Sequence, residues 1–149
     1  MKFRFSKRTI LGCALGMTIL VTPVSAATHE FNFKFTDVYT TKDYDEVWAK
    51  SDNENSWYIT LLKSAGLLKN SNMSSTNIFG CRMRDMSVEP TVDVYHTFSN
   101  YISNYKINYL NDSNGNQIAK MGHAMRLRAK KDDSSTSSSA LTVYGKCAP

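Results

Sequence analysis

The chain has 149 residues and a formal net charge of +5 at neutral pH. Four of its 18 basic residues lie within the first eight positions, so residues 27–149 keep 14 basic against 13 acidic residues, a formal charge of +1. A nearly neutral domain lacks the strong positive field that is typical of nucleic-acid-binding proteins, and we expect no nucleic-acid partner. The length of this part predicts a single domain with its own hydrophobic core.

The N-terminus has the pattern of a secretory signal peptide, which we place over residues 1–26. Its basic start is followed by an apolar stretch over residues 9–21 and by Val24-Ser25-Ala26, the small side chains that signal peptidase requires. The apolar stretch is shorter than the roughly 20 residues that a membrane anchor needs. We therefore expect cleavage after Ala26 and secretion of residues 27–149 as one domain.

Alternating apolar and polar side chains predict strands in the first half of the domain, because this alternation gives a strand one buried face. The alternation is clear over residues 31–35 and 57–61, and a short apolar segment covers residues 46–50. The polar residues 51–56 connect the segments 46–50 and 57–61. Their composition favours a hairpin between these segments.

Two polar loops are expected. Residues 66–77 are rich in Ser and Asn, and residues 131–139 contain a run of Asp, Ser and Thr. Leu67, Leu68 and Met73 interrupt the polar composition of the first loop. We expect that part of this loop folds back onto the body of the domain.

The second half of the domain repeats the strand pattern. The alternating segments cover residues 78–85, 92–98, 125–129 and 141–147. Residues 106–121 predict a further hairpin, because Asn114-Gly115 suits the positive φ angles of a tight turn. Helical spacing over residues 98–105 leaves a short helix there as an alternative. Together these segments predict an all-β fold, an antiparallel β-sandwich of roughly eight short strands.

Cys81 and Cys147 are the two cysteines that remain after the signal peptide. An even pair in an oxidising compartment is most simply a disulfide. Both residues are in phase with the apolar positions of their strands, so both point to the buried face. We expect a disulfide between them, which would stabilise the domain by about 4 kcal/mol in the chain-entropy model. A redox role would need a Cys-x-x-Cys pair, which the sequence lacks.

No residues are assigned to catalysis or to a metal. His29, His96 and His123 have no zinc, metalloprotease or triad spacing, and the last two fall on strand positions typical of structural histidines. The paired acids Asp43/Asp45 and Asp132/Asp133 fall in polar segments and are interpreted as solvated loop acids.

One concentration of positive charge remains in the mature domain. Arg126, Arg128 and Lys130 share one face of a strand, where neighbours are about 6.5–7 Å apart, a spacing suited to successive anionic groups on a polymer or a lipid surface. Lys120 extends this group, and Arg82 and Arg84 join it if their strand belongs to the same sheet. An ordinary solvated face, or an edge strand charged against association, is the simpler interpretation of the pattern.

Four segments carry a family resemblance: Phe31-Asn32-Phe33-Lys34-Phe35, Asn55-Ser56-Trp57-Tyr58-Ile59-Thr60, Met125-Arg126-Leu127-Arg128-Ala129 and Leu141-Thr142-Val143-Tyr144-Gly145. In order and pattern the chain resembles a family of small exported Gram-positive proteins that have a domain of unknown function. More distantly, it is similar to the secreted β-sandwich bacteriocins of the lactococcin type. The resemblance implies export and a sandwich fold, and it brings no catalytic motif.

We therefore expect a secreted, non-enzymatic protein that acts at or near the bacterial cell envelope, either bacteriocin-like or as an interaction protein. Its partner would be a cell-wall polymer, a membrane surface or a secreted protein, and no cofactor is expected. The alternative is an inhibitor of an extracellular hydrolase, which would present residues 66–77 or 131–139 as a rigid loop.

Overall fold

The computed structural model describes residues 27–88 and 91–149, so the predicted signal peptide lies outside the described residues. The described chain is all-β and contains nine strands. These are β1 (His29–Phe35), β2 (Thr41–Asp43), β3 (Trp48–Ala49), β4 (Ser56–Leu62), β5 (Phe79–Asp85), β6 (His96–Phe98), β7 (Ile102–Asn108), β8 (Ala124–Lys131) and β9 (Leu141–Ala148).

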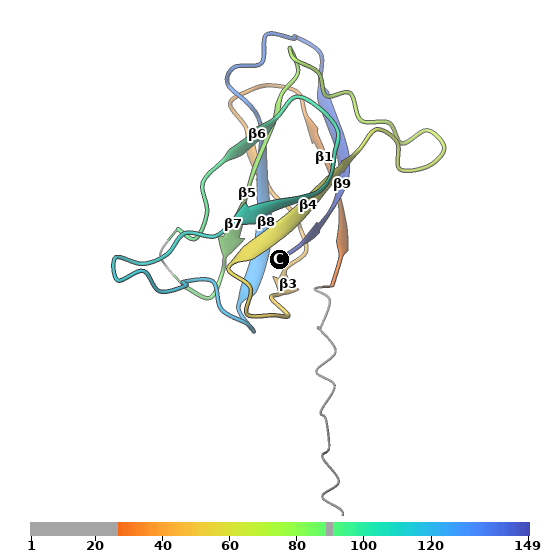
Figure 1. The fold of residues 1–149 in the computed structure, drawn as a ribbon. Coiled ribbons are helices and arrows are strands. Elements are labelled where there is room, and N and C mark those ends of the chain that lie inside the picture. The colour runs from red at the N-terminus through yellow and green to blue at the C-terminus, as the bar shows by residue number, and fades with distance from the viewer. Residues whose placement is uncertain (1–26, 89–90) are drawn as a thin grey trace, which may run out of the picture.

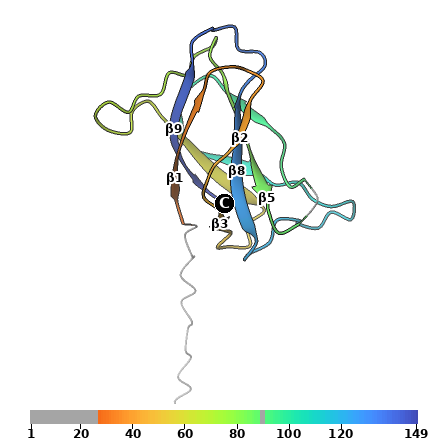
Figure 2. The same ribbon diagram turned by 180° about the vertical axis from the view of Figure 1, so that it is seen from behind.

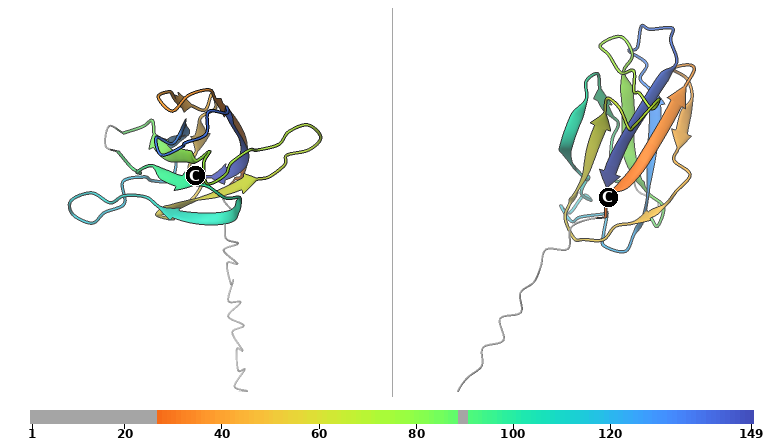
Figure 3. Two further views of the ribbon diagram at one scale, coloured as in Figure 1. Left: turned by 90° about the horizontal axis from the view of Figure 1, so that it is seen from above. Right: turned by 90° about the vertical axis from the view of Figure 1, so that its right-hand side faces the viewer.

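The strands form two antiparallel sheets (Figures 1 and 2). The first sheet has the order β1-β9-β4-β7, and the second has the order β2-β8-β5-β6 with β3 also paired to β8. Chain neighbours therefore rarely pair, and most pairs join strands that are distant in the sequence. Figure 3 shows the two sheets from above and from the side. The predicted all-β class and antiparallel pairing are confirmed.

Both sheets contribute to one core, because the long strands β1, β4, β5, β8 and β9 bury side chains in alternation. Phe31 and Phe33 of β1 contact Phe79 of β5, with ring centroids 6.3 Å and 6.2 Å from that of Phe79, and Phe35 stacks on Phe33. Gly145 of β9 lies opposite Phe31 in the register, and a Cβ atom at this position would overlap both the Phe31 ring and a backbone carbonyl of β4. The missing side chain of Gly145 thus makes room for an aromatic ring in the core.

The hairpin predicted between residues 46–50 and 57–61 is wrong. β3 pairs with β8 in the second sheet, whereas β4 pairs with β7 and β9 in the first sheet. Residues 50–55 therefore connect the two sheets. Alternation along a strand defines its buried face and leaves its partner unspecified, which is why the pattern did not reveal this crossing.

Residues 106–121 also differ from the predicted hairpin. β7 ends at Asn108, and beyond it the two sides of the turn share one isolated bridge, between Asn111 and Gln117. Gly115 has the expected positive φ of 82°. The positive φ was therefore predicted correctly for Gly115 but not for Asn114, and the segment after the turn does not continue as a paired strand. The alternative prediction of a short helix over residues 98–105 is wrong, because β7 begins within this segment.

The predicted disulfide between Cys81 and Cys147 is absent, and both residues are buried free cysteines. Their parity was predicted correctly, since both side chains belong to the core. However, Cys81 lies on β5 of the second sheet and Cys147 on β9 of the first. Packed sheets lie about 10 Å apart, while a disulfide needs Cα atoms within about 7 Å. Burial raises the pKa of both thiols, which keeps them protonated.

Candidate functional site

The outer face of the second sheet gathers five cationic side chains, which we call the basic face. They come from two adjacent strands, with Arg82 and Arg84 on β5 and Arg126, Arg128 and Lys130 on β8. In the register, Arg82 lies opposite Arg128, and Arg84 lies opposite Arg126. Since β5 and β8 pair directly, the structure meets the condition under which Arg82 and Arg84 were expected to join the group.

This register places like charges directly opposite one another in two successive cross-strand pairs. Directly opposed side chains on antiparallel strands have Cβ atoms about 4.5–5.5 Å apart, and like charges at this spacing destabilise the sheet. A single-residue shift of one strand would also turn its apolar side chains away from the core. The register of β5 and β8 therefore keeps these arginines side by side, although their mutual repulsion destabilises the pairing of the two strands.

Asp43 of β2 is the carboxylate that partly offsets this repulsion. It accepts hydrogen bonds from Arg128 Nε and Nη2, at 2.7 Å and 2.8 Å, and from Arg84 Nη1 at 2.9 Å. The hydrogen bond from Arg128 is the main reason why the pKa of Asp43 lies below its usual value. The pair also raises the pKa of Arg128. The prediction that Asp43 is a solvated loop acid is wrong, because the three-residue strand β2 pairs it with β8.

Arg82 and Arg126 form no ion pair with any residue in the described ranges. The Nε atom of each is buried and has no hydrogen-bond partner there. The guanidinium of Arg82 instead lies over the ring of Tyr95, 5.0 Å from its centroid, and Lys130 Nζ lies 5.3 Å from the same centroid. Tyr95 thus adds an aromatic ring to the basic face, a contact that no pattern in the sequence predicts.

The remaining cations are placed differently. Lys130 forms ion pairs with Asp133 at 3.0 Å and Asp132 at 3.7 Å, and the hydrogen bond to Asp133 chiefly raises its pKa. Lys120 is not on the basic face: it lies in the loop before β8, where its backbone amide approaches His123. Lys131 points inward, and its Nζ donates to two backbone carbonyls of the loop before β9.

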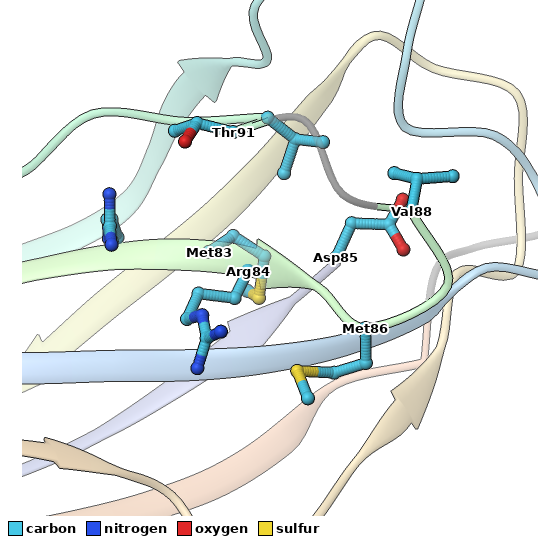
Figure 4. A pocket seen from close by; sticks show the side chains of 8 residues that line it. Met83, Arg84, Asp85, Met86, Val88 and Thr91 are labelled. Atoms are coloured by element: carbon cyan, nitrogen blue, oxygen red, sulfur yellow. The ribbon is translucent and has the colours of Figure 1, made fainter.

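A cavity of about 260 Å³ adjoins the basic face along the edge of β5. Its lining includes Arg82 and Arg84, and also the apolar side chains of Met83 and Val92. Figure 4 shows Arg84 extending over β8, while Asp85 leaves the strand on the other side. Two of the five cations therefore border a hollow as well as an open sheet surface.

Two histidine–aspartate pairs lie beside β5, one with His96 opposite Cys81 and the other at Asp85, the last residue of the strand. His96 Nε2 is 2.8 Å from Oδ1 of the buried Asp93, and His123 Nδ1 is 2.5 Å from Oδ2 of the buried Asp85. Asp93 also accepts hydrogen bonds from the indole of Trp57 and from two backbone amides. Within the described residues, neither histidine has a hydroxyl or thiol partner, and neither lines the cavity. The geometry is that of structural histidines that hold loops onto the core.

The part of the chain that the structure describes contains no cluster of three or more potential metal ligands. It likewise contains no helix that is long and apolar enough to cross a membrane. No family model matches the chain, and comparison with curated proteins and with solved structures found no match. The family resemblance drawn from the sequence therefore stays a prediction.

Proposed function

We propose that the protein is a secreted, non-enzymatic β-sandwich that acts at the bacterial cell envelope by binding an anionic polymer on its basic face. The main supporting observation is that arginines lie directly opposite one another at two successive positions of β5 and β8, Arg82 with Arg128 and Arg84 with Arg126. Neighbouring like charges weaken a folded protein unless a ligand or a counter-charge offsets them. Asp43 offsets two of these arginines, and Arg82 and Arg126 remain for a ligand.

The type of cation supports a ligand with phosphate or carboxylate groups. A guanidinium is planar and can donate two parallel hydrogen bonds to such a group, whereas a lysine acts as a point charge. Four of the five cations are arginines. Tyr95 restrains the Arg82 side chain through its ring, and a restrained side chain loses less conformational entropy when it binds.

The spacing supports a polymer rather than a single anion. Successive cations along β8 are about 6.5–7 Å apart, and those of β5 form a second row beside them. A repeating phosphodiester chain of the cell wall offers charges that several of these side chains can bind at once. Several weak contacts on one chain give a much stronger total attachment than each contact alone.

Sedimentation with isolated Gram-positive cell walls tests this function. We expect the protein to sediment with intact walls and to stay in solution when the phosphodiester polymers have been extracted. The double variant Arg82→Gln/Arg126→Gln should lose sedimentation. The matched control Lys34→Gln/Lys106→Gln removes two exposed cations from the strands of the first sheet and should keep it. Equal sedimentation of all three proteins, or no dependence on the polymer, would refute the proposal.

Growth assays separate the two roles at the envelope. A zone of inhibition on related Gram-positive cells would assign the bacteriocin-like activity that the resemblance implies. Wall binding without inhibition would assign an adhesive interaction protein.

A further inference from the structure

The connection between β4 and β5 projects from the body as a narrow finger, formed by residues 63–70. It extends to the right of the molecule in Figure 1 and also stands clear of the body in the view from above in Figure 3. A bridge between Ser64 and Asn70 and a hydrogen bond from the Ala65 amide to the Lys69 carbonyl, at 2.8 Å, hold its two sides together. The finger is therefore a hydrogen-bonded hairpin with a defined tip.

Two leucines form this tip. Leu67 is 96% exposed and Leu68 is 98% exposed, the highest values among the large hydrophobic residues of the described chain. The sequence predicted that these leucines fold back onto the domain, and this prediction is wrong for both. Met73, in the second part of the same connection, is buried as predicted. Packing within the domain therefore gives no reason for leucine at the tip.

The backbone of the tip also disfavours leucine. Leu68 has a φ of +66°, and the Lys69 amide donates to the Gly66 carbonyl across the turn. Glycine and asparagine adopt this left-handed conformation readily, whereas a bulky side chain does so at an energetic cost. Residues held in such conformations cluster at functional sites. A leucine at position 68 thus gains no stability from burial and costs free energy through its backbone angle.

Charge suggests what this tip contacts. Lys63 and Lys69 flank the leucines, both are exposed, and neither forms an ion pair with a residue that the structure describes. Between Glu54 and Asp85 the sequence contains no acidic residue. An apolar tip with a cationic base is complementary to a membrane whose lipid headgroups are negatively charged.

We propose that the finger inserts into the interface of an anionic lipid bilayer. Leu67 and Leu68 enter the boundary between headgroups and acyl chains, while Lys63 and Lys69 remain at the level of the headgroups. A tip of two adjacent leucines is too small for a stable protein interface, which buries about 800 Å² on each partner. A bilayer accepts such a tip without a shaped pocket. This contact is separate from the basic face, which lies on the outer face of the sheet formed by β2, β8, β5 and β6.

Vesicle binding tests the proposal. We expect the protein to float with phosphatidylcholine vesicles that contain phosphatidylglycerol. The variant Leu67→Ser/Leu68→Asn should bind them at least about a hundredfold more weakly, because each leucine contributes roughly tenfold or more. Lys63→Gln/Lys69→Gln should weaken binding only on the anionic vesicles, by roughly fivefold per lysine. As a matched control, Tyr39→Ser removes another side chain that is 91% exposed and should leave binding unchanged.

The variant Leu67→Ser/Leu68→Asn, which we call the finger variant, should fold at least as stably as the original chain, because asparagine tolerates the positive φ at position 68. An unchanged or raised unfolding midpoint of this variant would show that it is folded, so that weaker vesicle binding reports the loss of insertion. A third variant, Leu67→Trp, reports insertion directly. Trp48 and Trp57 are buried, so a blue shift on adding vesicles comes from the new indole.

Three results would overturn the proposal: the finger variant binding vesicles as tightly as the original chain, the indole at position 67 showing no blue shift, or a purified secreted protein binding the finger while vesicles do not. The basic-face variant Arg82→Gln/Arg126→Gln should still insert. If this variant loses wall binding and keeps vesicle insertion, the two surfaces act independently. The failure of one proposal is therefore distinguishable from the failure of the other.

Discussion

The substitution Asp43→Asn tests how the basic face is held together. It keeps the size of the side chain and removes the negative charge that Arg84 and Arg128 share. Three hydrogen bonds of 2.7–2.9 Å to charged donors are weakened at once. The two opposed arginine pairs then lose the carboxylate that offsets their repulsion.

The expected loss of stability is about 2 kcal/mol at neutral pH. A hydrogen bond to a charged group contributes roughly 1.5–3 kcal/mol. The Asp43 side chain is 23% exposed and those of Arg128 and Arg84 are 27% and 32% exposed, so solvent screening reduces the sum of the three bonds to about the value of one. Urea unfolding of both proteins at neutral pH measures this difference.

The pH dependence follows from the direction of the pKa shift. Because the pKa of Asp43 is lower in the folded protein than the ordinary value of 3.8 for aspartate, its contribution to stability is complete above about pH 3.8. The contribution is lost as the pH falls through the lower pKa of the folded state. The original chain and the Asn variant should therefore differ at neutral pH and converge in acid.

The same substitution should strengthen binding to an anionic polymer, since the basic face gains one unit of net positive charge. A variant that is less stable but binds more tightly separates the two roles of this surface. Equal stability at neutral pH, a difference that persists in acid, or weaker polymer binding would each refute the reasoning.

Three further substitutions or measurements address the core. Gly145→Ala should lower the unfolding free energy by about 1–3 kcal/mol, because the new Cβ overlaps Phe31 and a backbone carbonyl; an unchanged thermal midpoint would contradict this packing. Asp93→Asn should cost about 3 kcal/mol in urea unfolding, because one amide oxygen cannot replace a buried carboxylate with four hydrogen-bonding partners; a loss below measurement error would argue against the burial of the carboxylate. Cys81 and Cys147 should react with a thiol reagent only after unfolding without reductant, whereas no titratable thiol would mean that they form a disulfide.

The sequence predicted well whatever depends on alternation within one strand. In β8, Met125 and Leu127 are buried and Arg126 and Arg128 face outward, so the arginine row was visible from the pattern alone. Alternation gives a face but no partner, and the basic face exists only because β5 pairs with β8 in one particular register.

Most of the missed features depend on contacts between distant segments. β2 has three residues, too few for a periodic pattern, yet it brings Asp43 to Arg128 across 85 positions of sequence. Asp93 reaches Trp57 from another part of the chain in the same way. The cysteines show the converse case, because parity placed both in the core but on strands of different sheets, where they remain free thiols.

The salt dependence of polymer binding tests the central claim most directly. Binding to a soluble phosphodiester polymer is measured over a range of salt concentrations for the original chain and for Arg82→Gln/Arg126→Gln. If the basic face releases counterions from the polymer, the slope of log K against log salt should become shallower by roughly 1.5 when two arginines are removed, somewhat less than one unit for each cation. Equal slopes for the two proteins would show that these arginines do not contact the polymer, and would contradict the proposed function.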